Sequence, residues 1–219
     1  MPLSPPVARQ QLHTRRVVCQ GFFREDGLWD IEGRITDEKS YEHANEWRGP
    51  LAPGDFVHDM SIRLTLDHKL TIVDVEAVTD KSPYRVCGDI APDFRKLIGL
   101  RIGGGFHREV RARLGGVHGC THIVELLGPV ATTAFQTVSS RKASELNRAH
   151  REKKGTLPAK TDADAASAKP RRKPYVVDTC HAWAADGAVV KRWAPDFYTG
   201  PDAEAGRAAA AGKVIEMEG

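Results

Sequence analysis

The chain has 219 residues, of which 41% are hydrophobic, 28% charged and 7% aromatic. This apolar content is too high for a disordered polymer and too low for a membrane protein, which favours one compact domain with polar extensions. The net charge is only +3, and part of that excess lies in the basic runs 151–154 and 169–173, so the composition excludes the continuous basic face of a dedicated nucleic-acid binder.

A β-hairpin is predicted over residues 14–37. Its turn is Asp26-Gly27, a dipeptide typical of two-residue hairpin loops. Pairing outward from such a loop sets Arg24 opposite Trp29, where the guanidinium can lie over the indole ring. The same register places Cys19 on the polar face of the hairpin.

A second hairpin is predicted over residues 57–79, with its turn at His68-Lys69. Apolar and polar residues alternate along its first strand, which is the pattern of a strand with one buried face. In this register Leu64 pairs with Val73. His58 then lies on the apolar face.

The middle of the chain, from about 92 to 147, is predicted to be helical. The second of its helices starts after Gly103-Gly104-Gly105 and ends at Gly115-Gly116, where a helix-terminating glycine is expected. The third begins near Thr121 and is predicted to bend or restart at Gly128-Pro129.

The segment 148–174 has almost no large apolar residue and is predicted to be a polar basic linker or mobile loop. A third hairpin is predicted beyond it, with Asp186-Gly187 at the turn. The segments 1–13 and 201–219 are expected to be flexible termini.

Strands and helices are segregated along the chain, which argues against a parallel sheet with alternating helices. We therefore predict an α+β fold, in which antiparallel β-hairpins form one or two sheets packed against the helical segment. A single domain is expected to span residues 14–200.

Four cysteines, Cys19, Cys87, Cys120 and Cys180, stand singly along the chain without a Cys-x-x-Cys pair. This spacing fits free thiols better than a disulfide framework or a zinc ribbon. Neither a signal-peptide core nor a membrane-spanning apolar run is present, so we expect a cytoplasmic protein.

The most informative motif is the glycine-rich turn 115–119, which places Cys120 and His122 at the start of the third predicted helix. A helix N-terminus stabilises anions, so a thiol there is expected to have a lowered pKa, and the same position can bind a metal or an anionic substrate. Tight backbone packing at the glycines is the alternative explanation.

A second candidate cluster combines His58 and Asp59 with Cys87 and Asp89, which follow the second hairpin. A histidine on an apolar sheet face is more often a core residue than a catalyst, yet histidine is the side chain best matched to proton transfer near neutral pH.

The sequence does not identify a cofactor; the protein is expected to bind either none or a zinc or iron ion. Its candidate ligands are Cys87, Cys120, His122 and Cys180, which qualify only if the fold gathers them.

Several segments together resemble the bacterial family known as domain of unknown function 2889. They are Arg24 to Gly33, Val57 to Met60, Gly119 to His122 with Glu125 to Leu127, and Asp178 to Trp183 with Asp186-Gly187. The resemblance covers about residues 14–200. It implies no established activity.

The leading hypothesis is a small cytoplasmic enzyme that uses acid–base chemistry, of lyase or isomerase type, on a small aromatic or carboxylate-bearing metabolite. In it His58 or His122 transfers the proton and Cys120 or the helix start steadies developing negative charge. Substrate contacts are expected from Arg24, Trp29 and Arg63.

Two alternatives remain. One is a metal-binding or sulfur-handling protein centred on Cys120 and His122, and the other is a protein interaction module. The expected partner is a small-molecule substrate, without nucleic acid or membrane, and homo-oligomerisation stays open.

Overall fold

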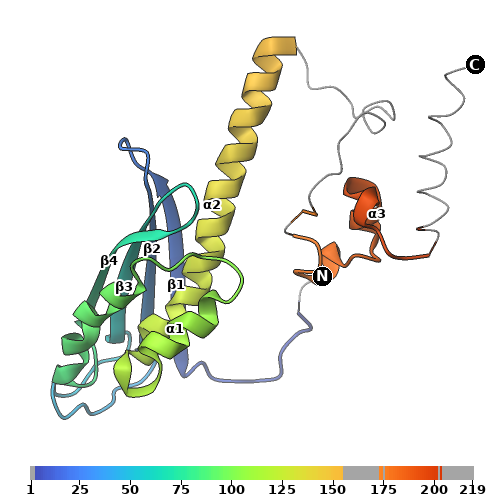
Figure 1. The fold of residues 1–219 in the computed structure, drawn as a ribbon. Helices are drawn as coiled ribbons and strands as arrows, with labels where there is room; N and C mark the ends of the chain where they lie inside the picture. Colours follow the sequence, from blue (N-terminus) through green and yellow to red (C-terminus); the bar gives the residue numbers. More distant parts are fainter. Residues whose placement is uncertain (1–2, 155–172, 175, 202, 204–219) are drawn as a thin grey trace, which may run out of the picture. The chain divides into compact units, whose positions relative to one another are not determined.

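The computed structural model describes residues 3–154, 173–174, 176–201 and 203, and over 142–154 it describes only the helical backbone (Figure 1). The chain divides into two compact units, residues 1–149 and 150–219, and each is described by itself. None of the described helices is long and apolar enough to cross a membrane.

A four-stranded antiparallel sheet in the order β1-β2-β3-β4 forms the centre of the first unit (Figure 1). Its strands are β1 (His13–Phe23), β2 (Trp29–Lys39), β3 (Phe56–Leu66) and β4 (Ile72–Lys81). One face of the sheet carries apolar residues that pack against the helices, as the alternating pattern requires. The predicted α+β fold is confirmed, with one sheet.

The helices of the first unit follow the strands along the chain. They are the 3-10 helix η1 (Arg85–Leu97), α1 (Phe106–Leu114), the short 3-10 helix η2 (Gly116–His118) and α2 (Thr121–Lys154). The predicted helix after the three glycines is therefore confirmed, because α1 buries Phe106, Val110 and Leu114 at helical spacing.

The predicted register of the first hairpin is wrong by one residue. The backbone N–H of Gly27 donates to the carbonyl of Arg24, and Gly27 has φ 85°, so the loop has three residues instead of two. Phe23, not Arg24, lies opposite Trp29. A one-residue slip exchanges the faces of a strand, so Cys19 packs against the core.

The second hairpin is shifted by two residues, because Leu64 pairs with Val75 instead of Val73. A shift of two keeps the side chains of β3 on their predicted faces. On β4 an irregularity beside Leu66 pairs that residue with Ile72, so Ile72 is buried and Val73 is exposed. The face of His58 is therefore confirmed: it lies on the same side of β3 as Met60, which is 1% exposed.

Helix α2 runs without interruption from Thr121 to Lys154, so the predicted restart at Gly128-Pro129 is wrong. Proline removes one backbone donor, but the surrounding residues Leu126, Leu127 and Val130 are buried against the sheet, and this packing holds the helix together. The first helical element is also longer than predicted, since η1 begins at Arg85.

The predicted third hairpin is wrong. In the second unit the described chain forms η4 (His181–Trp183), α3 (Ala188–Trp193) and η5 (Pro195–Phe197). Gly187 precedes the first residue of α3, so the Asp-Gly pair begins a helix. Of the predicted linker, 148–154 continue α2 and 155–172 lie outside the described residues, as do 202 and 204–219 of the C-terminal segment.

Gly33 lets α2 approach the sheet, because a Cβ atom there would lie 2.5 Å from Cγ2 of Val130. Val130 is β-branched in a helix and cannot turn away easily. We expect Gly33→Ala to lower the free energy of unfolding by about 1–3 kcal/mol, measured by urea denaturation. Gly104→Ala is the control, since no atom lies within 4 Å of its added Cβ; equal losses in both variants would contradict this account of the packing.

Candidate active site

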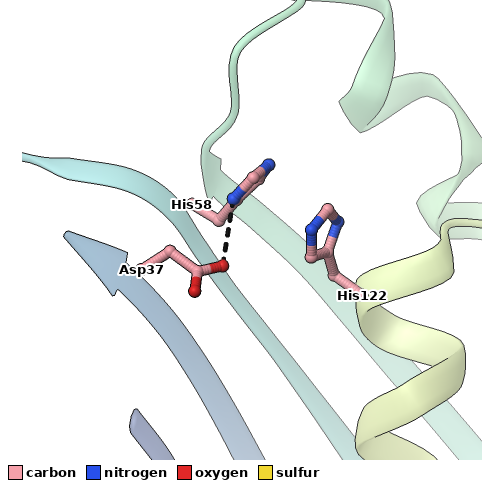
Figure 2. A group of neighbouring side chains, drawn as sticks. All are labelled: Asp37, His58 and His122. Carbon is pink, nitrogen blue, oxygen red and sulfur yellow. Dashed lines mark hydrogen bonds and ion pairs between the residues drawn. The ribbon is translucent and has the colours of Figure 1, made fainter. Parts of the chain in front are cut away.

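Asp37 lies at the centre of the candidate site, on the helix-facing side of β2. Its direct cross-strand neighbours are Arg15 on β1 and His58 on β3. The Asp37 side chain is only 1% exposed, and the carboxylate accepts four hydrogen bonds. Three come from Arg15 Nε, Arg15 Nη2 and His13 Nε2, at 2.8, 2.9 and 2.9 Å. The fourth comes from Nδ1 of His58 at 3.0 Å (Figure 2).

These contacts keep Asp37 ionised. Burial acts to raise the pKa of its carboxyl, but the hydrogen bonds from Arg15 and His13 outweigh burial and lower the pKa to about 2. An ionised carboxylate only accepts hydrogen bonds. The bonded nitrogen of His58, Nδ1, must therefore carry a proton.

His58 consequently has a defined tautomer. With Nδ1 protonated, the neutral ring presents Nε2 as an unprotonated acceptor. Burial, together with the neighbouring His122, lowers the pKa of His58 below its ordinary value. The charge of Asp37 and its hydrogen bond to His58 act to raise the pKa of His58, but their effect is the weaker one. His58 is thus a neutral, oriented base at neutral pH.

His122 lies in the first turn of α2 and stacks on His58, with ring centroids 3.9 Å apart and planes tilted by 33° (Figure 2). Burial also lowers the pKa of His122. Two cationic rings this close would repel each other. The two histidines together therefore hold at most one proton beyond those of their neutral rings near neutral pH. It acts as one unit that accepts and returns a single proton.

Cys120 lies two residues before His122, and its sulfur atom is between the side chains of Met60 and His122. Its Sγ lies 3.6 Å from Sδ of Met60 and 3.9 Å from Nδ1 of His122. The glycine before it, Gly119, is required by packing, because a Cβ there would lie 2.3 Å from the carbonyl oxygen of Leu114. The glycine-rich turn therefore has a packing role and also positions Cys120.

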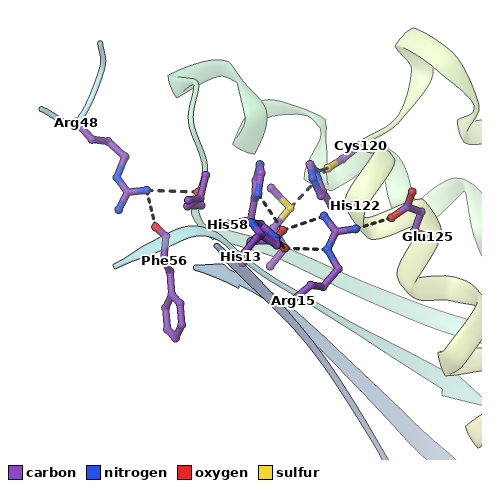
Figure 3. Close-up of polar contacts among 11 residues, drawn as sticks. His13, Arg15, Arg48, Phe56, His58, Cys120, His122 and Glu125 are labelled. Atoms are coloured by element: carbon purple, nitrogen blue, oxygen red, sulfur yellow. Dashed lines mark hydrogen bonds and ion pairs between the residues drawn. The ribbon is translucent and has the colours of Figure 1, made fainter. Parts of the chain in front are cut away.

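An ion pair joins the sheet to α2 beside these histidines. Nη1 of Arg15 donates to Glu125 at 2.9 Å, while its other nitrogens hold Asp37 (Figure 3). Arg15 thus connects β1, β2 and α2, and fixes the end of α2 that carries His122.

A cavity of about 570 Å³ opens next to the two histidines. His58, Cys120 and His122 line it together with Met60 and with six residues from the start of η1 and the loop before it, namely Pro83, Tyr84, Val86, Cys87, Asp89 and Ile90. Its size is that of a pocket for a small organic molecule.

The structure brings together most of the residues from the two predicted clusters. His58, Cys87, Asp89, Cys120 and His122 all line this cavity. Asp59 does not, because its side chain lies on the opposite face of the sheet and pairs with Arg34 at 2.7 and 2.8 Å.

The predicted substrate contacts lie elsewhere. Arg24 is at the hairpin turn and pairs with two aspartates. Trp29 is in the core, where its ring centroid lies 4.6 Å from the ring centroid of Phe23. Arg63 pairs with two glutamates on the outer face of the sheet. Cys180, a predicted metal ligand, is exposed in the second unit.

The described residues contain one cluster with metal-ligand chemistry. Asp37, His58 and His122 offer ligand atoms that all lie within 4.8 Å of one another. The four hydrogen bonds to Asp37, however, occupy all four lone-pair positions of its carboxylate. Asp37 is therefore built to orient His58, and a bound ion would have to rely on the two histidines.

Sequence reasoning missed Asp37, Arg15 and His13. A usable signal existed for Asp37, since it shares strand parity with the buried Ile31 and Ile35 and is a carboxylate on an apolar face. Arg15 was out of reach because the incorrect hairpin register turned it to the other side. His13 was expected in the flexible segment 1–13, whereas β1 begins at this residue.

Comparison with known proteins gives one match. The family model described as "Protein of unknown function (DUF2889)" matches residues 13–136, which include both strands of the first hairpin, the cavity and the first half of α2. No curated protein and no solved structure gives a significant match.

Proposed function

Since the chain belongs to the DUF2889 family, whose function is unknown, we propose from the site geometry that it is a small-molecule enzyme using acid–base chemistry. We further propose a lyase or isomerase type of reaction, on a small aromatic or carboxylate-bearing metabolite, in the cytoplasm. The observation on which this depends is the hydrogen bond from His58 to the buried Asp37 at the wall of a cavity.

The Asp37–His58 pair has the parts of a general base. The carboxylate fixes the ring orientation and the tautomer, and it stabilises the imidazolium that forms when Nε2 takes a proton. Because the Asp37 side chain is 1% exposed, water does not compete for these contacts.

In the proposed reaction, Nε2 of His58 removes a proton from the substrate. The electron pair of the broken bond forms a new double bond, either as a leaving group departs or as the double bond shifts. The imidazole pair of His58 and His122 returns the proton to the leaving group or to a second substrate atom, so the proton count closes. Negative charge that develops on the substrate lies near Cys120 and the N-terminus of α2.

Deuterium transfer from solvent tests this proposal. The protein is incubated in D2O with a panel of small aromatic compounds and carboxylic acids, and substrate and product are followed by proton NMR. We expect an isomerised, cleaved or deuterated product that requires His58 or His122. Full turnover in both the His58→Ala and His122→Ala proteins would refute the assignment.

A metal-binding or sulfur-handling role centred on Cys120 and His122 is the second candidate. The observation in its favour is the close approach of the Asp37, His58 and His122 ligand atoms. In this alternative, Cys120, His122 and His58 would hold zinc or iron, and Asp37 would orient His58 from behind.

Elemental analysis of protein purified without a metal-binding tag separates the two candidates. We expect no near-stoichiometric zinc or iron, because Asp37 has no lone pair left for an ion. A stoichiometric metal that disappears in Cys120→Ser or His122→Ala, and not in the control Cys180→Ser, would favour the metal site instead.

A further inference from the structure

We propose that the cavity beside His58 and His122 binds an uncharged aromatic compound with a phenolic hydroxyl group, and not a carboxylate. This inference rests on the proposed acid–base function and narrows its substrate class. It depends on three features of the cavity: an apolar rim, an interior rich in sulfur and aromatic rings, and the charges along its wall.

The rim of the cavity is apolar and open to solvent. Tyr84, Val86 and Val117 line it, and they are 58%, 70% and 90% exposed. They come from two separate segments of the chain that meet at this cavity. Exposed apolar side chains that gather around one cavity mark a surface that a ligand covers.

The interior favours a flat ring. Sδ of Met60 and Sγ of Cys120 lie 3.6 Å apart in the wall, next to the stacked imidazoles of His58 and His122. Thioether sulfur and aromatic side chains make favourable contacts with the edges and faces of aromatic rings. An aliphatic ligand of the same size would lose these contacts.

The charges along the wall disfavour an anion. Among the residues that the structure describes, neither a lysine nor an arginine lines the cavity, whereas Asp89 does. Arg15 is committed elsewhere, because Nε and Nη2 bind Asp37 and Nη1 binds Glu125. A substrate carboxylate would therefore lose water without gaining a cationic partner.

A hydroxyl group completes the fit. Nε2 of neutral His58 is an acceptor without a proton, so a neutral O–H donor on the ligand matches it. A phenol brings this donor on an aromatic ring, and its acidic proton is one that an imidazole can take.

The test is a titration of the full-length protein, followed in its amide NMR spectrum, with three probes of similar shape. The probes are para-ethylphenol, para-ethylbenzoate and ethylcyclohexanol. At neutral pH we expect para-ethylphenol to bind about tenfold tighter than the benzoate and about threefold tighter than the cyclohexanol. The shifted amide signals should belong to the cavity, including Val86 and Val117.

Two variants and one control sharpen this result. Asp89→Asn should strengthen benzoate binding and leave the phenol nearly unchanged. Val86→Asp should weaken the phenol about fivefold by placing a charge on the apolar rim. Val73→Asp is the control, because Val73 is an exposed valine of β4 that does not line the cavity.

Benzoate binding equal to or tighter than phenol binding, or amide shifts only outside the cavity, would overturn the inference. The proposed function fails separately. Selective phenol binding without any solvent deuterium transfer would refute the catalytic role and leave the ligand class standing. His58-dependent turnover of carboxylates alone would refute the ligand class and leave the catalytic role standing.

Discussion

Replacing His58 by alanine is expected to lower kcat for the substrate found in the D2O panel by about 100-fold to 10,000-fold, the range contributed by a positioned acid or base. KM should change much less, because the cavity walls at Met60, Tyr84, Val86 and Cys120 remain in place. Steady-state kinetics on the purified variant measure both constants.

Two further variants make this result interpretable. His122→Ala should lower kcat less than His58→Ala, because Asp37 bonds to His58 and not to His122. His68→Ala removes an exposed histidine in the β3–β4 turn and should keep full activity. A His58→Ala protein that is folded by circular dichroism and retains wild-type kcat would rule out His58 as the base.

Removing the buried carboxylate is expected to produce the largest loss of stability. Asp37→Ala leaves Arg15, His13 and His58 without their shared acceptor, and breaking a buried charge pair costs about 3–5 kcal/mol. The Arg15 side chain is 39% exposed and can recover some hydration, so we expect about 3 kcal/mol, the lower end of that range. Chemical denaturation at neutral pH measures it.

The control and the pH dependence identify the cause. Asp74→Asn breaks a pair whose two side chains are 57% and 62% exposed, and should change stability by less than about 0.5 kcal/mol. The pKa of Asp37 falls from 3.8 to about 2 on folding, so its stabilisation is present above pH 3.8 and is lost as pH falls towards 2. Asp37→Asn should therefore flatten the acid side of the stability curve. An unchanged curve would contradict the buried pair.

The sheet could be predicted from sequence because its signals are local. Apolar residues alternate along β2 and β3, and the Asp-Gly pair at 26–27 does lie in the turn between β1 and β2. The register of a hairpin is less accessible, since an Asp-Gly pair occurs in both two-residue and three-residue loops. The same dipeptide at 186–187 does not form a hairpin turn. It precedes α3, whose first residues are Ala188, Val189 and Val190.

The candidate site could be predicted only in part. His58, Cys120 and His122 were accessible because each lies beside a turn or on a strand with clear alternation. Asp37 depends on the pairing of β2 with β3, which joins two hairpins and is not encoded in either one. The expected substrate contacts Arg24 and Arg63 are held by ordinary ion pairs that only the paired strands reveal.

The central claim is that Asp37 holds His58 as a neutral base with Nε2 unprotonated, and nitrogen NMR of the imidazole rings tests it most directly. In the wild-type protein at neutral pH, we predict that His58 carries its proton on Nδ1, and that Asp37→Asn removes this preference. A cationic His58 ring, or a proton on Nε2, would contradict the account.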